Sequence, residues 1–348
     1  MGDRVDKKAA TIYDIAKRVG LSAATVSRVI NNKGYISEET RRLVMDASRE
    51  LQYTPNQIAR SLKDQKTRQI VLSIPYVKEV FNFDLIAAVQ SVVIENDYSL
   101  LLSYTQASEK EEAKVLDSLF RNYADGLILT TTNISERLAE KISGVHQPVV
   151  VSCFSNNRIT GDKRVYDYVG VDAEKGVYIS TGHLIRQGHV KIGYMGPPLK
   201  NQLGDDRYSG YCLAMNEAGL RIDPGLVRTG GHSELFGYEA GMAMADSGGL
   251  PTAICASTDL IVLGVYKAFE QKGIKIPEDV CVVGMDNIDI CTLVKPKISS
   301  VAISQEEIGR AAAEIIFERI NGSTAPKKSM IFQPRLVVRE SSIQVKLQ

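Results

Sequence analysis

Residues 11–31, with the sequence TIYDIAKRVGLSAATVSRVIN, constrain the fold more than any other stretch of this chain. Thr11 can cap a helix, and the apolar residues after it recur at helical spacing, namely Ile12, Ile15, Ala16 and Val19. Gly20 ends this helix, and Ser22 caps a second one. Two short helices joined by a Gly-containing turn predict a helix-turn-helix, a unit that presents its second helix to the DNA major groove. An ordinary helical hairpin in another kind of bundle is the alternative.

Charge is distributed unevenly along the chain. Residues 1–68 hold 14 Lys and Arg against 8 Asp and Glu. The whole chain holds 42 against 41, which leaves 28 against 33 for the rest. A basic N-terminal part on an acidic remainder is typical of a nucleic-acid-binding module attached to a part that should avoid DNA. This distribution favours the helix-turn-helix interpretation over the hairpin.

A third helix and a short hinge segment follow. Ser37 can cap a helix whose first turn holds Glu38 and Glu39, where a helix N-terminus favours negative charge. Four of its apolar residues are predicted to close a three-helix core: Leu43, Val44, Ala47 and Leu51. Pro55 ends this element, and Asn56 can cap the stretch QIARSLK. Because a helix this short is unstable alone, the segment should fold only when something pairs with it; a plain linker is the alternative.

Residues 11–31, the cap at Ser37 and the stretch YTPNQIARSLK together resemble the head and hinge of the lactose-repressor/galactose-repressor family of bacterial transcription regulators. The resemblance implies that the second helix reads the major groove. It also implies that the hinge helices of two subunits fold together in the minor groove, where Leu62 wedges a base step apart and Ala59 shares its apolar face. By the same resemblance, contacts to the DNA backbone fall on Thr11, Tyr13, Ser22, Thr25, Ser27, Asn31, Tyr35, Ser37 and Asn56.

The recognition helix departs from the lactose and purine repressors at its first two positions. Those repressors carry larger polar residues where Ala23 and Ala24 stand in this chain. Two alanines can offer only methyl contacts, for instance to thymine. We therefore expect Arg28, placed to read guanine, to be the main direct reader of sequence.

From Ile70 onward, short apolar runs alternate with amphipathic helical patterns. Runs such as IVLSIP, GLILTTT and VCVVGMD are strand-like, and helical patterns lie between them, for example at 83–96 and 174–187. Alternation at this spacing predicts βαβ units and parallel sheets. A segment of about 280 residues exceeds one such sheet, so two lobes are expected.

The family resemblance extends to this α/β part, which looks like a periplasmic sugar-binding protein with two similar lobes, three crossover segments and an effector in the cleft. The fold class expected is an all-α helix-turn-helix head with a hinge helix, on an α/β body of two parallel-sheet lobes. The predicted domains are a head at 1–55, a hinge at 56–68 and a body at 69–348, with lobe 1 at about 69–168 plus 302–332 and lobe 2 at about 169–301 plus 333–348.

Candidate effector ligands lie where strands end, because open parallel sheets bind ligands at the carboxyl ends of their strands. Asp286 ends VCVVGMD, Phe81 follows the first strand, and Arg207 lies in DDRYSGYCLAMNEAGL, which resembles a family helix start. An arginine and a carboxylate can hold the hydroxyls of a polyol, and an aromatic ring can pack on a sugar face. Taken alone, Arg207 could form a surface salt bridge and Asp286 could cap a helix. The resemblance favours effector binding, and it adds His232 and Thr258 at neighbouring positions.

Signatures of enzymes, metal sites and membrane segments are missing from the sequence. It has no G-x-G-x-x-G after the first strand, no G-x-x-x-x-G-K-[ST] and no G-x-S-x-G. The five cysteines show no metal-binding spacing, so we expect reduced cysteines, no metal and no cofactor. The start MGDRVDKK lacks the apolar stretch of a signal peptide, and no apolar run reaches the length of a membrane span, so a cytoplasmic protein is expected.

These patterns predict a non-enzymatic transcription regulator, a repressor that binds a pseudo-palindromic DNA operator as a homodimer. A small-molecule effector, of the sugar type by resemblance, would control it, and a phosphoprotein corepressor is the alternative controlling partner. An enzyme on the same α/β body is opposed by the missing motifs. A pure solute-binding protein is opposed by the basic head. The leucine-rich tail that makes the lactose repressor a tetramer has no counterpart in VVRESSIQVKLQ, which favours a dimer.

The hinge interpretation predicts the effect of one substitution. Leu62→Ala should weaken operator binding strongly, because opening a base step costs a few kcal/mol that only a rigid apolar wedge offsets. Non-specific binding and its salt dependence should barely change, because no phosphate contact is lost. Titration of operator and random duplexes measures both. Hinge amides should exchange freely without DNA and become protected on the operator, and protection already present without DNA would contradict the proposed folding on DNA.

Overall fold

The computed structural model describes residues 10–54, 66–76, 82–153, 165–199 and 202–343. The chain divides into two compact units, 1–67 and 68–348, which we call the head and the body. The hinge residues Asn56, Ala59 and Leu62 and the candidate effector ligand Phe81 lie outside the described residues.

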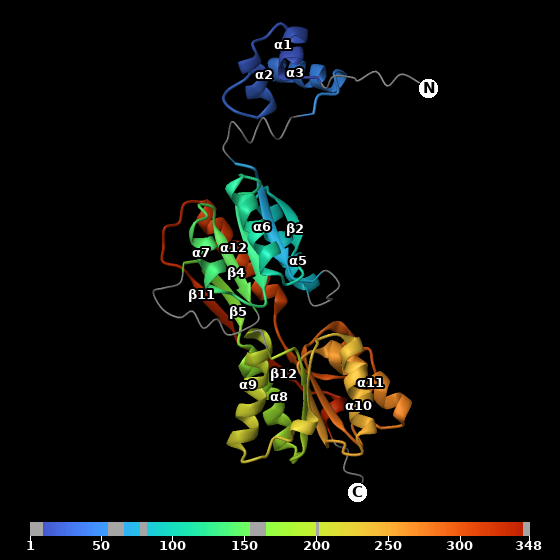
Figure 1. Cartoon of the computed structure of the whole chain (residues 1–348). Coiled ribbons are helices and arrows are strands. Elements are labelled where there is room, and N and C mark those ends of the chain that lie inside the picture. The colour runs from blue at the N-terminus through green and yellow to red at the C-terminus, as the bar shows by residue number, and fades with distance from the viewer. Residues whose placement is uncertain (1–9, 55–65, 77–81, 154–164, 200–201, 344–348) are drawn as a thin grey trace, which may run out of the picture. The chain divides into compact units, whose positions relative to one another are not determined.

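The described residues of the head form three helices, α1 (Ile12–Val19), α2 (Ala23–Ile30) and α3 (Glu38–Glu50) (Figure 1). They pack around a small core in which Ile15, Val26 and Val44 are fully buried. Gly20 takes the left-handed conformation that ends α1, with φ of 68°. The helix-turn-helix spacing in the sequence therefore corresponds to two packed helices joined at this glycine.

One expected core residue of the head is exposed. Leu43 was expected to close the core with its neighbours on α3, but it is 49% exposed. Val44 and Ala47 are buried and Leu51 packs against them. Successive residues of a helix are turned by about 100°, so the face that holds Val44 and Ala47 turns Leu43 outward.

Across its described ranges, the body forms two six-stranded sheets (Figure 1). In the first sheet every pair of neighbouring strands is parallel. In the second sheet the neighbours are parallel except for the edge strand β12, which is antiparallel to β10. In spatial order the first sheet consists of β11 (Ser329–Phe332), β5 (Asp167–Val171), β4 (Val149–Cys153), β3 (Gly126–Thr131), β1 (Gln69–Ile74) and β2 (Ser99–Tyr104). The second consists of β12 (Arg335–Val337), β10 (Ser299–Ala302), β9 (Cys281–Asp286), β8 (Ala253–Ala256), β6 (Ile192–Gly196) and β7 (Val227–Thr229).

Helices cover both faces of each sheet, as parallel sheets require. One face of the first sheet carries α5 (Asn82–Glu95) and α12 (Gln305–Ile320), and the other carries α6 (Glu109–Phe120) and α7 (Glu136–Ser143). One face of the second sheet carries α8 (Ala173–Arg186) and α9 (Gln202–Glu217), and the other carries α10 (Glu234–Asp246) and α11 (Asp259–Lys272). Three short 3-10 helices complete the elements: η1 (Pro224–Leu226), η2 (Asp289–Thr292) and η3 (Glu340–Ser342).

We call the first sheet with its helices lobe 1 and the second sheet with its helices lobe 2. The chain crosses between them after β5, after β10 and between β11 and β12. The first crossing follows Val171, because β5 stays paired in the first sheet up to that residue. The largest buried apolar cluster includes residues of both lobes, such as Val171 and Ala173 on either side of the first crossing.

A buried ion pair joins α12 to β5 inside lobe 1. The Arg319 guanidinium donates to both oxygens of Asp167, with Nη2–Oδ1 at 2.7 Å and Nε–Oδ2 at 3.0 Å. The amide of Lys328 donates to the same carboxylate, which is fully buried. Burial alone would raise the pKa of Asp167, but the bonds from Arg319 and Lys328 outweigh it and lower this pKa.

This ion pair predicts a pH-dependent loss of stability. Asp167→Asn should lower the free energy of unfolding at pH 7 by roughly 3–5 kcal/mol, because it leaves a buried arginine unpaired. A carboxylate with a lowered pKa stabilises the folded state above pH of about 4, and this contribution disappears as the pH falls through the folded pKa. The penalty should therefore shrink in acid.

Urea unfolding at pH 7 and at about pH 3 measures the penalty. The matched control is Asp117→Asn, which removes a surface ion pair with Lys141 and should cost less than about 1 kcal/mol. An equal penalty for Asp167→Asn at both pH values would show that the ion pair is not its cause.

Candidate DNA-binding face and effector pocket

Three helices of the head begin with a hydroxyl cap. Thr11 and Asp14 form a capping box, in which the Thr11 amide donates to Asp14 Oδ2 at 2.8 Å. Ser22 Oγ accepts from the amide of Thr25 at 3.1 Å, and Ser37 caps α3 in the same way. The N-terminus of a helix carries unpaired amides and a partial positive charge, so it suits a phosphate. The capping residues expected at the DNA backbone therefore lie at three such helix starts.

The outer face of α2 is small and mostly exposed. Ala24 and Arg28 are exposed, whereas Ala23 is half-buried and packs against the core of the head. Ser27 and Thr25 are also half-buried, and the side-chain Nδ2 of Asn31 donates to the carbonyl of Ser27 at 2.8 Å. Tyr13 is 76% exposed and Tyr35 is fully exposed. Among these residues, Arg28 and the two tyrosines have the reach to contact a duplex.

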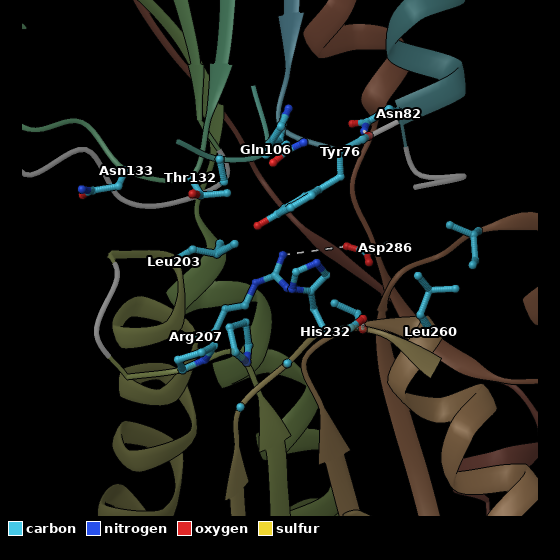
Figure 2. A pocket seen from close by; sticks show the side chains of 18 residues that line it. Tyr76, Asn82, Gln106, Thr132, Asn133, Leu203, Arg207, His232, Leu260 and Asp286 are labelled. Carbon is cyan, nitrogen blue, oxygen red and sulfur yellow. Dashed lines mark hydrogen bonds and ion pairs between the residues drawn. The ribbon is translucent and has the colours of Figure 1, made fainter. Parts of the chain in front are cut away.

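A pocket of about 460 Å³ lies between the two lobes of the body, at the carboxyl ends of strands from both sheets. Figure 2 shows its polar side chains converging from opposite sides. Lobe 1 contributes Tyr76, Asn82, Gln106, Thr132 and Asn133, and lobe 2 contributes Leu203, Arg207, His232, Thr258, Leu260 and Asp286. This size and lining are typical of a site for a small polar molecule.

Arg207 of α9 brings a buried positive charge into the pocket. It is 3% exposed, and its Nη1 donates to the carbonyl of Ser257 at 2.7 Å. Its Nη2 lies 3.9 Å from Oδ1 of Asp286, a distance too long for a strong hydrogen bond (Figure 2). Within the described part of the chain, its Nε has no hydrogen-bond partner. A guanidinium has five N–H donors, so this one has capacity for a ligand.

Asp286 stands on a strained turn at the end of β9. Its φ is 112° and that of Asn287 is 55°, in a region that non-glycine residues rarely adopt. Arg339 donates to Asn287 Oδ1 at 2.7 Å, and Ser300 Oγ accepts from the Asn287 amide at 3.0 Å. Strain of this kind persists only where the surroundings hold it, and it concentrates at functional sites.

A buried carboxylate beneath this turn holds it as well. Asp259 of α11 accepts from Ser300 Oγ at 2.6 Å and from the amide of Ile288 at 3.0 Å. Asp259 is fully buried, and burial raises its pKa to about 6 despite these hydrogen bonds. The turn that presents Asp286 is therefore tied to α11, β10 and the C-terminal segment.

Aromatic rings meet across the pocket. The ring of Tyr76, from lobe 1, lies 5.1 Å from the ring of His232, from lobe 2, at an interplanar angle of 44°. Asn82, which is 1% exposed, donates to the carbonyl of Tyr76 at 2.9 Å. Thr258 caps α11 and donates to the carbonyl of His232 at 3.0 Å. Each ring is thus held at its backbone by a neighbouring polar side chain.

The sequence located one side of this pocket better than the other. Four candidates lie in its lining, Arg207, His232, Thr258 and Asp286, all from lobe 2. The lining residues of lobe 1 were missed, among them Tyr76, Asn82 and Gln106. Several of these follow directly after strands of the first sheet, so the rule that ligands bind at carboxyl ends of strands could have found them.

Other candidate chemistry in the body is structural. His183 Nε2 lies 2.8 Å from Ser342 Oγ, and His189 Nδ1 lies 3.0 Å from Thr252 Oγ1. None of the five cysteines, all of which lie in the described ranges, forms a disulfide. Within the described ranges, no three His, Cys, Asp or Glu side chains gather as a metal site would require. No helix in those ranges has the length and apolar character to span a membrane.

Comparison with known proteins covers almost the whole chain. Residues 11–56 match the model of bacterial regulatory proteins of the lacI family, and residues 181–342 match that of a periplasmic binding protein-like domain. The chain is 32% identical over 333 residues to the HTH-type transcriptional repressor PurR of Pasteurella multocida (strain Pm70), covering 95% of this chain and 98% of that protein. It is 30% identical over 338 residues to the ribose operon repressor of Haemophilus influenzae (strain ATCC 51907 / DSM 11121 / KW20 / Rd), covering 97% and 100%.

A solved structure has a similar fold. The transcriptional regulator CelR–cellobiose complex is 27% identical, with a TM-score of 0.71, and the match covers 95% of this chain and 99% of that one. The helix-turn-helix head, the two-lobed body and these relatives lead to one assignment. The protein belongs to the lacI family of bacterial regulatory proteins and is an effector-controlled, DNA-binding transcriptional repressor.

Proposed function

We propose that the protein binds a pseudo-palindromic operator as a homodimer and that a small polar effector in the inter-lobe pocket controls this binding. The observation that carries the proposal is the buried Arg207–Asp286 pair, which faces an open volume between two lobes. A single helix-turn-helix reads one half-site, so two copies related by a two-fold axis fit a pseudo-palindrome.

Control would operate through the arrangement of the lobes. A ligand that contacts Tyr76 and Asn82 from lobe 1 and Arg207 and Asp286 from lobe 2 favours the lobe arrangement in which it can reach both sets. The three crossovers allow such a rearrangement by hinge motion. The lobe arrangement in turn sets the spacing of the two hinge segments, which decides whether they can fold together on DNA.

We propose a sugar-type effector. The N–H groups of Arg207 can donate to hydroxyl oxygens, the carboxylate of Asp286 can accept from hydroxyl groups, and the ring of Tyr76 offers an apolar surface. One relative is named a ribose operon repressor, and one neighbouring structure is a complex with cellobiose. A phosphoprotein corepressor is the alternative partner, and the polar pocket favours a small molecule over it.

An apolar surface on lobe 1 supports the homodimer. Edge strand β2 and helix α5 expose large apolar side chains, namely Phe83, Ile94, Leu101, Leu102 and Tyr104. Exposed apolar edge strands invite pairing with another chain unless they are covered. A second copy placed here would cover them, and exposed Leu235 and Leu293 on lobe 2 could extend the contact.

We propose no catalytic role, because the relatives are named as repressors and the pocket chemistry suits binding. We place the protein in the cytoplasm, because a bacterial operator lies there.

Arg28 tests the DNA-binding part. Arg28→Ala should weaken binding to an operator selected from a random duplex pool by roughly 1–3 kcal/mol, and binding to random duplex by less, because a guanine contact is specific to sequence. Fluorescence anisotropy at fixed salt measures both. Arg49→Ala, in the last turn of α3, removes the same charge and is the control. Equal losses of affinity on both duplexes would show that Arg28 contacts only phosphate groups.

Asp286 and Arg207 test the effector part. Pentoses, hexoses, disaccharides and nucleobases are screened by thermal shift, since a ligand at 100 times its Kd adds about 2.7 kcal/mol to stability. Asp286→Asn, which tolerates the positive φ, and Arg207→Lys should each weaken binding of the ligand found by roughly 2–5 kcal/mol. Arg221→Ala, an exposed arginine outside the pocket lining, is the control. Unchanged affinity in both pocket variants would place the site elsewhere.

A further inference from the structure

The body begins at a residue in an unfavourable backbone conformation. Arg68 directly precedes β1 and has a φ of 55°, in the left-handed region that non-glycine residues rarely adopt. It is exposed, so packing of its side chain does not explain this conformation. Such strain persists only where surrounding contacts over-determine it, and its presence points to a function.

Hydrogen bonds fix the backbone of Arg68 to the beginnings of two neighbouring strands, β2 and β3. Its amide donates to Asp125 Oδ2 at 2.9 Å, and its carbonyl accepts from the amide of Ser99, the first residue of β2, at 2.9 Å. The Asp125 amide donates to the carbonyl of Gln69, the first residue of β1, at 2.8 Å. Asp125 itself directly precedes β3. Arg68 is therefore a corner tied to the beginnings of β1, β2 and β3.

Asp125 lies beside the packed interior of lobe 1. It is half-buried and follows Ala124, which is 1% exposed. The ring of Tyr98 packs edge-on against that of Phe317 in α12, with centroids 5.1 Å apart and an interplanar angle of 78°. Burial raises the pKa of Tyr98 to about 12, and the neighbouring Asp125 carboxylate adds to the rise. The carboxylate that holds Arg68 is therefore backed by the interior of lobe 1.

We propose that Asp125 is a positioning residue for operator binding, because it locks the Arg68 corner. It thereby fixes where the linker, residues 55–65, leaves lobe 1. This inference rests on the proposed dimeric operator binding, which needs two heads delivered at a set spacing. When the corner opens, residues 66–68 join the linker and lengthen it. A longer, looser tether lowers the effective concentration of the second head once the first has bound.

Two neutral substitutions separate this role from a charge effect. Asp125→Ala removes the acceptor, whereas Asp125→Asn removes the charge but keeps an oxygen that can accept from the Arg68 amide. Binding to an operator selected from a random duplex pool by the wild-type protein should weaken by about 1.5- to 2-fold for Asp125→Ala, because three extra linker residues lower the effective concentration of the second head modestly. Asp125→Asn should stay close to wild type, and binding of both variants to random duplex should be unchanged.

Two further measurements distinguish the positioning role of Asp125 from a general loss of folding in the variants. Amide hydrogen exchange in the DNA-free protein should show the Arg68 amide protected in the wild type and in Asp125→Asn, and fast in Asp125→Ala. Inserting three glycines between Lys66 and Thr67 lengthens the linker by the same three residues while leaving the body intact, and it should reproduce the loss of operator binding.

The possible outcomes separate a failure of the positioning role from a failure of the proposed function. Equal operator binding by all variants, or equal losses for Asp125→Ala and Asp125→Asn, would overturn the positioning role while operator binding by the wild type still stands. A glycine insertion without effect would also overturn it. If the wild-type protein selects no operator over random duplex, the proposed function fails, and the positioning role fails with it.

Discussion

The compensation of the buried Arg207 guanidinium is the interaction on which the rest of the body depends. Burying a charge is costly unless partners compensate it, and this one has a single strong acceptor, the Ser257 carbonyl, and a carboxylate at 3.9 Å. The remaining donor capacity faces the volume between the lobes. A site of this kind is more fully satisfied when a polar ligand adds its own acceptors, which couples occupancy of the pocket to the positions of α9 and β9.

Parallel sheets explain why this charge meets groups from distant parts of the chain. Each strand of a parallel sheet delivers its carboxyl end to the same edge, and here the edges of both sheets meet at one pocket. The turn after β9 presents Asp286 in a strained conformation, and Asp259, Ser300 and Arg339 supply the bonds that hold it. Rigid support of this kind lets small changes at a ligand move whole lobes and not single side chains.

The edge of lobe 1 that holds the start of β1 shows the same design. Arg68 is strained there, and Asp125 and Ser99 hold its backbone. Strain is thus held by hydrogen bonds both at the pocket and at the point where the linker joins the body. When both points are fixed, a change in lobe arrangement can be transmitted to the linker. The proposed control of DNA binding requires this transmission.

The sequence by itself determined the features that depend on local patterns. The caps at Thr11, Ser22 and Ser37, the turn at Gly20 and the alternation of strands and helices follow from short-range backbone chemistry, and they predicted both the head and the α/β class of the body. Arg207 was found because its segment resembles a family motif, and Asp286 was found because it ends a strand-like run.

Tertiary structure alone decided how these elements share their surfaces. It turned Leu43 outward and Ala23 partly inward, because packing of three helices chooses which face of each is buried. It kept β5 in the first sheet up to Val171, where β5 pairs with β11, since strand pairing sets the lobe boundary. It also brought Tyr76 of lobe 1 against His232 of lobe 2, and set Asp125 against Arg68. Contacts between residues far apart in sequence depend on the closure of the whole fold, which local patterns do not encode.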